Sequence, residues 1–300
     1  MNSPLSRRDL LRLAATTAAA ALVPVRLPAR DPDRARLTAW AAALRGMGPA
    51  RLQAPLGVEA ARVGELAVGT PYEPYTLEAY LRAGGSPSGT EPLTLSLTRF
   101  DCATLVESCL AVARVADAGA SPSWERFGRE IERMRYRGGT RRGYASRLHY
   151  FSEWMSDGER RGLLRNLGAT LGGAEDSRPL RFMTAHRERY PALADDGVFH
   201  EIEAMERRLD SHPRRVVPTK RIPEVVDRIE TGDVLAFATG IAGLDVTHAA
   251  LAYRDARGIL RVLHAPLSGG LVAITRTTLP EYVAAIRHAT GILVARPRRA

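Results

Sequence analysis

The sequence predicts an α+β protein, because helical patterns come early in the chain and strand patterns come late. The clearest helical pattern lies at residues 101–118, where apolar or small side chains recur at the i, i+3, i+4, i+7 spacing of a helix buried on one face. From residue 232 onward, short β-rich segments alternate with turn residues. Helices followed by closely connected strands indicate an antiparallel sheet with the helices packed on it.

The helical part is expected to run from residue 31 to residue 155. Its second helix ends at Gly69-Thr70-Pro71-Tyr72, because Gly and Pro stop helices. A Gly/Ser/Pro-rich loop at 83–92 precedes the striped helix. In chain order the helices are expected at 31–56, 58–68, 101–118, 123–134 and 146–155. We interpret the polar stretch 156–220 as helical fragments and loops that elaborate this core.

The strand part is expected to contain five short strands. They are predicted at 233–239, 246–254, 259–265, 270–275 and 290–295. A short helix at 279–288 separates the last two. The chain therefore ends in a sheet that can carry functional side chains beside the helices.

The bulk composition limits the classes of function. The chain has 300 residues and a hydrophobic content of 45%, which suits one large domain or two small ones. No apolar run reaches the roughly 20 residues of a spanning helix, so we expect no integral membrane segment in the mature chain. The net charge of +10 raises the question of nucleic-acid binding. We expect no nucleic-acid partner, because the basic residues are scattered and no binding motif accompanies them.

Residues 1–30 have the pattern of a twin-arginine signal peptide. Arg7 and Arg8 precede an apolar stretch at 13–25, which is too short for a transmembrane helix. The alternative is an amphipathic helix of a cytosolic protein. The signal predicts export to the periplasm or cell envelope and leaves residues 31–300 as a single domain.

The two cysteines, Cys102 and Cys109, are predicted to stay unpaired. Seven residues of helix separate Cα atoms by about 10 Å, whereas a disulfide needs them within about 7 Å. Asp101 is a good N-cap and places Cys102 in the first turn of the helix. The N–H groups and the dipole of a helix N-terminus favour a thiolate and can hold an oxyanion. Cys102 is therefore a candidate nucleophile, although a buried structural cysteine is the alternative, and it suits Cys109 well.

Two histidines lie on neighbouring predicted strands and could supply a base for the thiol. A three-residue turn at 256–258, with Gly258 in the left-handed conformation, would place His264 opposite Ala250. Ala250 shares a strand face with His248, so the two imidazoles become diagonal neighbours. A two- or four-residue turn would put them on opposite faces. Core or surface histidines and a zinc site are the alternatives, but we find no third ligand at a suitable spacing.

Several motifs resemble the NlpC/p60 cysteine peptidase superfamily, and the similarity runs from about residue 58 to 295. In chain order they are Gly69-Thr70-Pro71-Tyr72, Phe100-Asp101-Cys102, Thr231-Gly232-Asp233-Val234, Thr247-His248-Ala249-Ala250-Leu251 and Leu263-His264-Ala265. Tyr136–Trp154 resembles the branch described as N-acetylmuramoyl-L-alanine amidase-like. The sequence has Asp-Cys-Ala where many relatives have Asp-Cys-Ser-Gly, a difference that the branch tolerates.

The resemblance implies a papain-like NlpC/p60 fold, in which a Cys-bearing helix packs on an antiparallel sheet with helical elaborations. It implies that Cys102 is the nucleophile, that His248 is the base and that His264 orients the base. Tyr72 matches a tyrosine near the nucleophile. We expect Tyr72, Asp101, Arg147 and His149 to contact substrate, whereas most aromatic residues of 143–154 are expected in the core.

The predicted reaction is hydrolysis of an amide in peptidoglycan or a muropeptide, with the bond between N-acetylmuramic acid and L-Ala favoured by the branch resemblance. The alternatives are a γ-D-glutamyl-diaminopimelate endopeptidase and a non-catalytic wall-binding protein. Cys–His hydrolysis requires neither a metal nor an organic cofactor, and we expect none.

Overall fold

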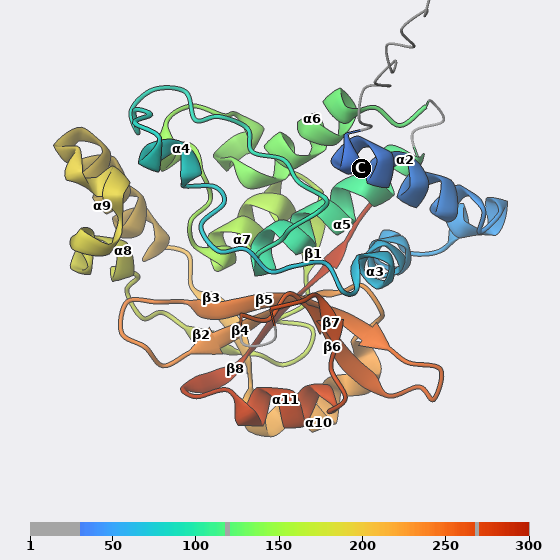
Figure 1. The fold of residues 1–300 in the computed structure, drawn as a ribbon. Coiled ribbons are helices and arrows are strands. Elements are labelled where there is room, and N and C mark those ends of the chain that lie inside the picture. The colour runs from blue at the N-terminus through green and yellow to red at the C-terminus, as the bar shows by residue number, and fades with distance from the viewer. Residues whose placement is uncertain (1–30, 118–120, 268–269, 300) are drawn as a thin grey trace, which may run out of the picture. The chain divides into compact units, whose positions relative to one another are not determined.

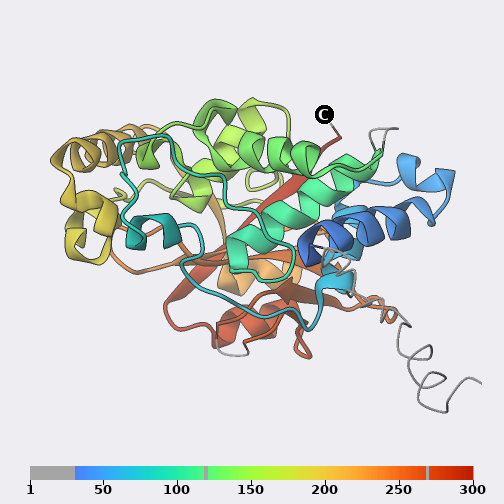
Figure 2. The same ribbon diagram turned by 45° about the horizontal axis from the view of Figure 1, so that its top comes forward.

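The computed structural model describes residues 31–117, 121–267 and 270–299, and residues 32–300 form one compact unit. The predicted signal peptide at 1–30 lies outside the described residues. Five longer helices form a layer on one face of the sheet (Figures 1 and 2). They are α2 (Pro32–Arg45), α3 (Leu56–Ala67), α5 (Cys102–Asp117), α6 (Trp124–Arg135) and α7 (Phe151–Arg160). Among the described residues, no helix is both long enough and apolar enough to span a membrane.

The sheet is antiparallel throughout its described pairs. Its strand order is β2-β3-β8-β4-β5-β6-β7, and β1 also pairs with β8. The strands are β1 (Leu164–Asn166), β2 (Ala174–Asp176), β3 (Arg214–Pro218), β4 (Val234–Thr239), β5 (Val246–Arg254), β6 (Leu260–His264), β7 (Ala273–Ile274) and β8 (Ala289–Pro297). The α+β class with an antiparallel sheet is confirmed.

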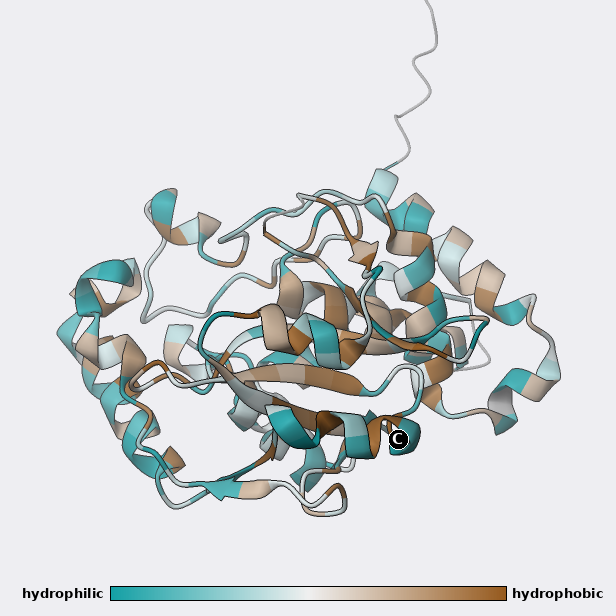
Figure 3. Cartoon of the chain, turned by 90° about the horizontal axis from the view of Figure 1, so that it is seen from below, coloured by the Kyte–Doolittle hydropathy of each residue, from teal (hydrophilic) through white to brown (hydrophobic). Residues whose placement is uncertain are grey.

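Both faces of the central strands are covered. Ala249, Leu251 and Leu263 pack into the core under the helical layer. Ala250 and Ala252 pack into a second core, which α10 (Ile222–Val225) and α11 (Leu279–Ala285) cover from below. Burial on both faces explains why these strands are apolar along most of their length, as Figure 3 shows.

The stretch 156–220 differs from its prediction, because three of its segments are strands. β1, β2 and β3 join the sheet beside β8. Two α-helices also lie in this stretch, α8 (Phe182–Ala185) and α9 (Asp196–Leu209), and the α9 N-cap Asp195 accepts a hydrogen bond from the Val198 N–H at 3.1 Å. These helices enclose a third, smaller core together with Tyr144 and Tyr150.

Two predicted helices are also corrected. The stretch 31–56 breaks after α2 into a 3-10 helix that begins at Pro49, because proline removes an N–H that a continuing helix needs. Helix α7 begins at Phe151 rather than at residue 146, because the Leu148 N–H bonds to the Arg135 carbonyl at 2.9 Å. The remaining short helices are α4 (Ala79–Arg82) and the 3-10 helices Pro49–Gln53, Arg137–Gly139, Tyr144–Ser146, Arg187–Arg189, Pro191–Ala194, Thr219–Arg221 and Val226–Arg228.

The motif at 231–234 has a structural role. Gly232 has φ 83°, and a Cβ there would lie 1.8 Å from the Gly57 carbonyl oxygen, so only glycine lets α3 approach the sheet so closely. The carboxylate of Asp233 is buried and accepts from the Arg296 guanidinium at 2.8 Å. This motif therefore fixes the packing of the sheet at some distance from the predicted nucleophile.

Candidate active site

Cys102 is the first residue of α5, as the sequence predicts. Asp101 caps the helix, because its Oδ1 accepts from the Thr104 N–H at 2.7 Å and from the Thr104 hydroxyl at 2.8 Å. The Asp101 N–H donates in return to the Thr104 hydroxyl at 2.9 Å. The predicted N-cap is thus confirmed, whereas a contact of Asp101 with substrate remains a prediction.

The sulfur of Cys102 lies against the backbone of β5, at the residue that follows His248. The N–H of Ala249, a buried residue of β5, hydrogen-bonds the sulfur. The N–H of Ala103 also bonds it. Cys102 is half-buried and unpaired, and Cys109 is buried in the core and also unpaired, as predicted.

Burial of Cys102 outweighs the preference for a thiolate that the helix N-terminus was expected to give it. Burial, and secondarily the Asp101 carboxylate, raise the pKa of Cys102 to about 12, although the N–H groups of Ala249 and Ala103 act in the opposite direction. The helix terminus alone therefore does not ionise this thiol, because desolvation disfavours the charged form more strongly. A nearby base must remove its proton during any reaction.

This thiol pKa predicts the pH dependence of alkylation. In a Cys109→Ala variant, iodoacetamide should modify Cys102 slowly at pH 7, and the rate should climb about tenfold per pH unit up to pH 9, since only the thiolate reacts. The unfolded chain provides the control and should react near the ordinary thiol pKa. A rate that stays flat from pH 5 to 8 would instead indicate a resting thiolate–imidazolium pair.

The hairpin that carries the two histidines has the predicted register. Leu251 pairs with Leu263, and the Asp255 N–H donates to the Ile259 carbonyl at 3.0 Å. Gly258 has φ 79°, as the three-residue turn requires. The pairing places His264 opposite Ala250, on the strand face that His248 shares.

His248 and His264 are in direct contact and are named here the histidine pair. Nε2 of His248 lies 2.9 Å from Nδ1 of His264, and the ring centroids are 5.1 Å apart. A β-bulge precedes His248, because Phe237 pairs with His248 while Ala238 pairs with Val246. Bulges re-aim side chains beside active sites, and this one sets the direction of the His248 ring.

Both members of the histidine pair are neutral at pH 7. Burial, followed by the proximity of His264, lowers the pKa of His248 to about 3. Burial lowers the pKa of His264 to about 4. A neutral imidazole can accept a proton, so His248 has the form that a general base needs.

Tyr282 is a member of this cluster that the sequence analysis missed. Its hydroxyl lies 3.1 Å from Nδ1 of His264, and its ring meets the His264 ring edge-on at 85°. The Phe237 ring packs against both His248 and Tyr282, with centroid distances of 5.7 and 5.3 Å. Tyr282 comes from α11, on the far side of the sheet from α5.

Tyr72 lies near Cys102, the predicted nucleophile. It forms a β-bridge with Phe100, two residues before Cys102. Burial, followed by the charge of an ionised Cys102, raises the pKa of Tyr72 to about 12. The half-buried phenol therefore stays protonated and can donate a hydrogen bond.

Arg147 is placed differently from the expectation of a substrate contact. Its guanidinium is only 5% exposed and lies 2.7 Å from the Glu78 carboxylate and 3.5 Å from that of Glu91. It also lies over the Tyr144 ring at 4.8 Å. These internal partners occupy the planar fork that we expected to bind a muropeptide carboxylate.

His149 is half-buried beside the same cluster. Its Nε2 lies 2.9 Å from the Tyr144 carbonyl oxygen, and the two rings are 4.4 Å apart. Burial, and then the charge of Arg147, lower the pKa of His149. The structure therefore gives His149 an internal partner as well, and its contact with substrate remains a prediction.

We predict that Arg147→Ala mainly destabilises the fold. The change leaves Glu91, whose carboxylate is 1% exposed, without its cation, and breaking a buried pair costs about 3–5 kcal/mol. Urea unfolding measures this loss, with the exposed Arg142→Ala as the control from the same segment. A variant of unchanged stability with a raised KM would restore Arg147 as a substrate contact.

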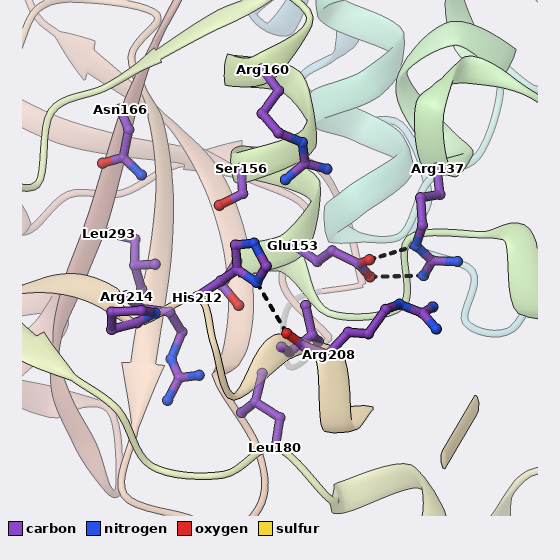
Figure 4. A pocket seen from close by; sticks show the side chains of 13 residues that line it. Arg137, Glu153, Ser156, Arg160, Asn166, Leu180, Arg208, His212, Arg214 and Leu293 are labelled. Atoms are coloured by element: carbon purple, nitrogen blue, oxygen red, sulfur yellow. Dashed lines mark hydrogen bonds and ion pairs between the residues drawn. The ribbon is translucent and has the colours of Figure 1, made fainter. Parts of the chain in front are cut away.

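A separate cavity of about 230 Å³ lies between α7 and α9 (Figure 4). Four arginines line it, namely Arg137, Arg160, Arg208 and Arg214. Its one lining carboxylate, Glu153, is held by Arg137 at 2.6 and 2.9 Å. None of the predicted site residues lines this cavity, so it is distinct from the site formed by Cys102 and the histidine pair.

No third metal ligand joins the histidine pair in the part of the chain that the structure describes. Across those residues, no group of three or more His, Cys, Asp or Glu side chains is arranged to hold a metal ion. The two imidazoles are instead hydrogen-bonded to each other.

The structure is an α+β protein with a thiol at the start of α5, against the backbone of the strand that carries His248, and with a hydrogen-bonded histidine pair. The chain belongs to the AmiA-like, N-acetylmuramoyl-L-alanine amidase-like family, whose model matches residues 62–292.

Solved structures of similar fold include an amidase. A crystal structure of an N-acetylmuramoyl-L-alanine amidase from Bacteroides uniformis is 28% identical with a TM-score of 0.73, and the match covers 81% of this chain and 99% of that one. A Bacteroides fragilis protein with a provisional xylanase assignment is 32% identical with a TM-score of 0.70, over 78% and 99%. A Legionella pneumophila protein, 17% identical with a TM-score of 0.60 over 86% and 94%, shares the fold. No curated protein matches this chain.

Proposed function

We propose that this protein is a cysteine-dependent cell-wall amidase with a papain-like NlpC/p60 fold, which cleaves the amide between N-acetylmuramic acid and L-Ala. One observation carries the proposal. The Cys102 sulfur, at the N-terminus of α5, is hydrogen-bonded by the N–H of Ala249, the residue that follows His248 of the histidine pair. Family membership and the Bacteroides uniformis amidase support the substrate class.

The reaction proceeds by acyl transfer to sulfur. His248 takes the Cys102 proton as the sulfur attacks the lactyl carbonyl of the muramic acid, and N–H groups at the start of α5 hold the oxyanion. The imidazolium then protonates the leaving amine of L-Ala, which gives a thioester. His248 next activates water, which releases the lactyl carboxylate and restores the thiol.

His248 Nδ1 is the ring nitrogen available for these proton transfers, because Nε2 faces His264. A thiol with a raised pKa and an imidazole with a lowered pKa both start neutral. Proton transfer therefore accompanies attack, and the developing charge is stabilised by the N–H groups that already surround the sulfur.

Mass spectrometry of a digested disaccharide–tetrapeptide tests the bond assignment. The amidase releases free disaccharide and an intact tetrapeptide, whereas a γ-D-glutamyl-diaminopimelate endopeptidase leaves the disaccharide attached to a dipeptide. A protein that binds the muropeptide but leaves it uncut would be the non-catalytic wall binder. The xylanase assignment of one relative gains no support from this cluster, because glycosidases use a pair of facing carboxylates.

We also propose that residues 1–30 direct export through the twin-arginine route and that residues 31–300 act as one domain in the periplasm or cell envelope. The support is the Arg7–Arg8 pair before a short apolar stretch. Changing both arginines to lysine should retain the protein inside the cell, as fractionation would show. Unchanged export of that variant would rule out this route.

A further inference from the structure

We propose that Tyr282 is a positioning residue, which holds the histidine pair in the one tautomer that lets His248 accept the Cys102 proton. The inference rests on the proposed function, since it concerns the same base. It assigns a role in the reaction to a residue of α11, an element that the sequence motifs do not include.

The geometry places two hydrogen-bonding groups on one ring nitrogen. Nδ1 of His264 lies 2.9 Å from Nε2 of His248 and 3.1 Å from the Tyr282 hydroxyl. His264 is only 4% exposed, so water has little access to compete for that nitrogen. The tautomer of His264 is therefore decided mainly by these two neighbours.

Two arrangements of protons satisfy the contact between the imidazoles. In the first, His248 carries its proton on Nε2 and donates it to Nδ1 of His264, which leaves His248 Nδ1 free to accept. In the second, His264 carries the proton on Nδ1 and donates it to His248 Nε2. A neutral His248 then has its proton on Nδ1 and cannot take another there. Only the first arrangement serves the proposed reaction.

The Tyr282 hydroxyl favours the first arrangement. Burial, and then the charge of an ionised Cys102, raise the pKa of Tyr282 to about 12, so the phenol keeps its proton at neutral pH. Its O–H can donate only to a nitrogen that carries a lone pair, and Nδ1 of His264 carries one, which it shares between Tyr282 and the His248 Nε2–H, in the first arrangement alone. The same donor contact persists when His248 becomes an imidazolium, because Nε2 of His248 still donates to His264.

Packing keeps the phenol in this position. Phe237 contacts the rings of both His248 and Tyr282. The start of α11 is fixed by a capping box, in which the Glu281 carboxylate accepts from the Thr278 N–H at 2.8 Å. Tyr282 is thus presented by a short, well-capped helix rather than by a loop.

The test compares Tyr282→Phe with Tyr253→Phe. Tyr253 is the matched control, because it lies on β5 but its hydroxyl bonds Glu65 at 2.6 Å. Tyr282→Phe should lower kcat about three- to tenfold with KM unchanged, the range expected for one lost hydrogen bond to a neutral group. Nitrogen-15 NMR should show His248 Nε2 losing protonated character in Tyr282→Phe, whereas Tyr253→Phe matches the wild type in both readouts.

A double-mutant cycle separates tautomer control from simple packing. The carboxylate that His264→Asp introduces can only accept a hydrogen bond, so it needs no tautomer control. Tyr282→Phe should then have little further effect on kcat in the His264→Asp background. An equal loss in both backgrounds, or a protonated His248 Nε2 in Tyr282→Phe, would overturn the proposal. The NMR readout does not require turnover. If the wild type cuts no muropeptide, the proposed function is refuted, but the NMR comparison still tests the role of Tyr282.

Discussion

Replacing Cys102 with alanine should reduce hydrolysis of a defined muropeptide by about 10⁴-fold or more, because the variant has no atom to form the acyl intermediate. The side chain lies at the helix surface and is half-buried, so its removal should leave the fold intact. Binding of the muropeptide should survive, since the N–H groups around the sulfur remain. Initial rates and isothermal titration calorimetry measure the two effects separately.

The second cysteine provides the control for this experiment. Cys109 lies two turns further along α5 and is buried in the core. Cys109→Ala should retain nearly full activity and lose a little stability, because it removes one buried sulfur. If Cys102→Ala remains active, or if both variants lose activity equally, Cys102 is not the nucleophile.

The second large effect is expected for His248→Gln, which should lower kcat about 10³-fold. Glutamine keeps a polar side chain of similar length but cannot accept the thiol proton, and a positioned general base contributes about 10²–10⁴-fold. KM should change little, because the ring is not required to bind the muropeptide. Steady-state kinetics at substrate concentrations above KM would measure the loss.

The lowered pKa of His248 adds a prediction about pH. The neutral imidazole is the active form, and it is lost only as the pH falls through about 3. The wild-type kcat/KM should therefore stay flat from about pH 8 down to pH 5 and fall to half its plateau only near pH 3. An acidic limb centred near pH 6.5 would mean that burial does not control this base.

Much of the site could be predicted from the sequence, because its parts are local. The Asp101 cap and the first-turn cysteine depend on neighbouring residues, and both were confirmed. The contact between His248 and His264 followed from the length of one turn, since strand register is fixed by turn length.

The features that were missed depend on segments far apart in the chain. β1, β2 and β3 are short, and their pairing with β8 or with each other carries no local pattern. The ion pairs of Arg147 with Glu78 and Glu91 were not predicted, because these two glutamates lie on a distant loop whose position no spacing reveals.

The ionisation state of Cys102 and the contact between Tyr282 and His264 were the least predictable features. The helix terminus at Cys102 suggested a thiolate, but the degree of burial decides the balance, and burial is a property of the whole fold. Tyr282 reaches His264 only because α11 packs under the sheet, and the predicted helix at 279–288 gave no sign of that contact.

The most direct test of the central claim is to trap the acyl-enzyme with hydroxylamine during turnover of a disaccharide–tetrapeptide. A thioester on Cys102 partitions between water and hydroxylamine, so we predict a hydroxamate on the lactyl group of the muramic acid alongside the free acid. Hydrolysis that continues at the same rate with no hydroxamate would mean that water attacks the amide directly, which would contradict a cysteine nucleophile.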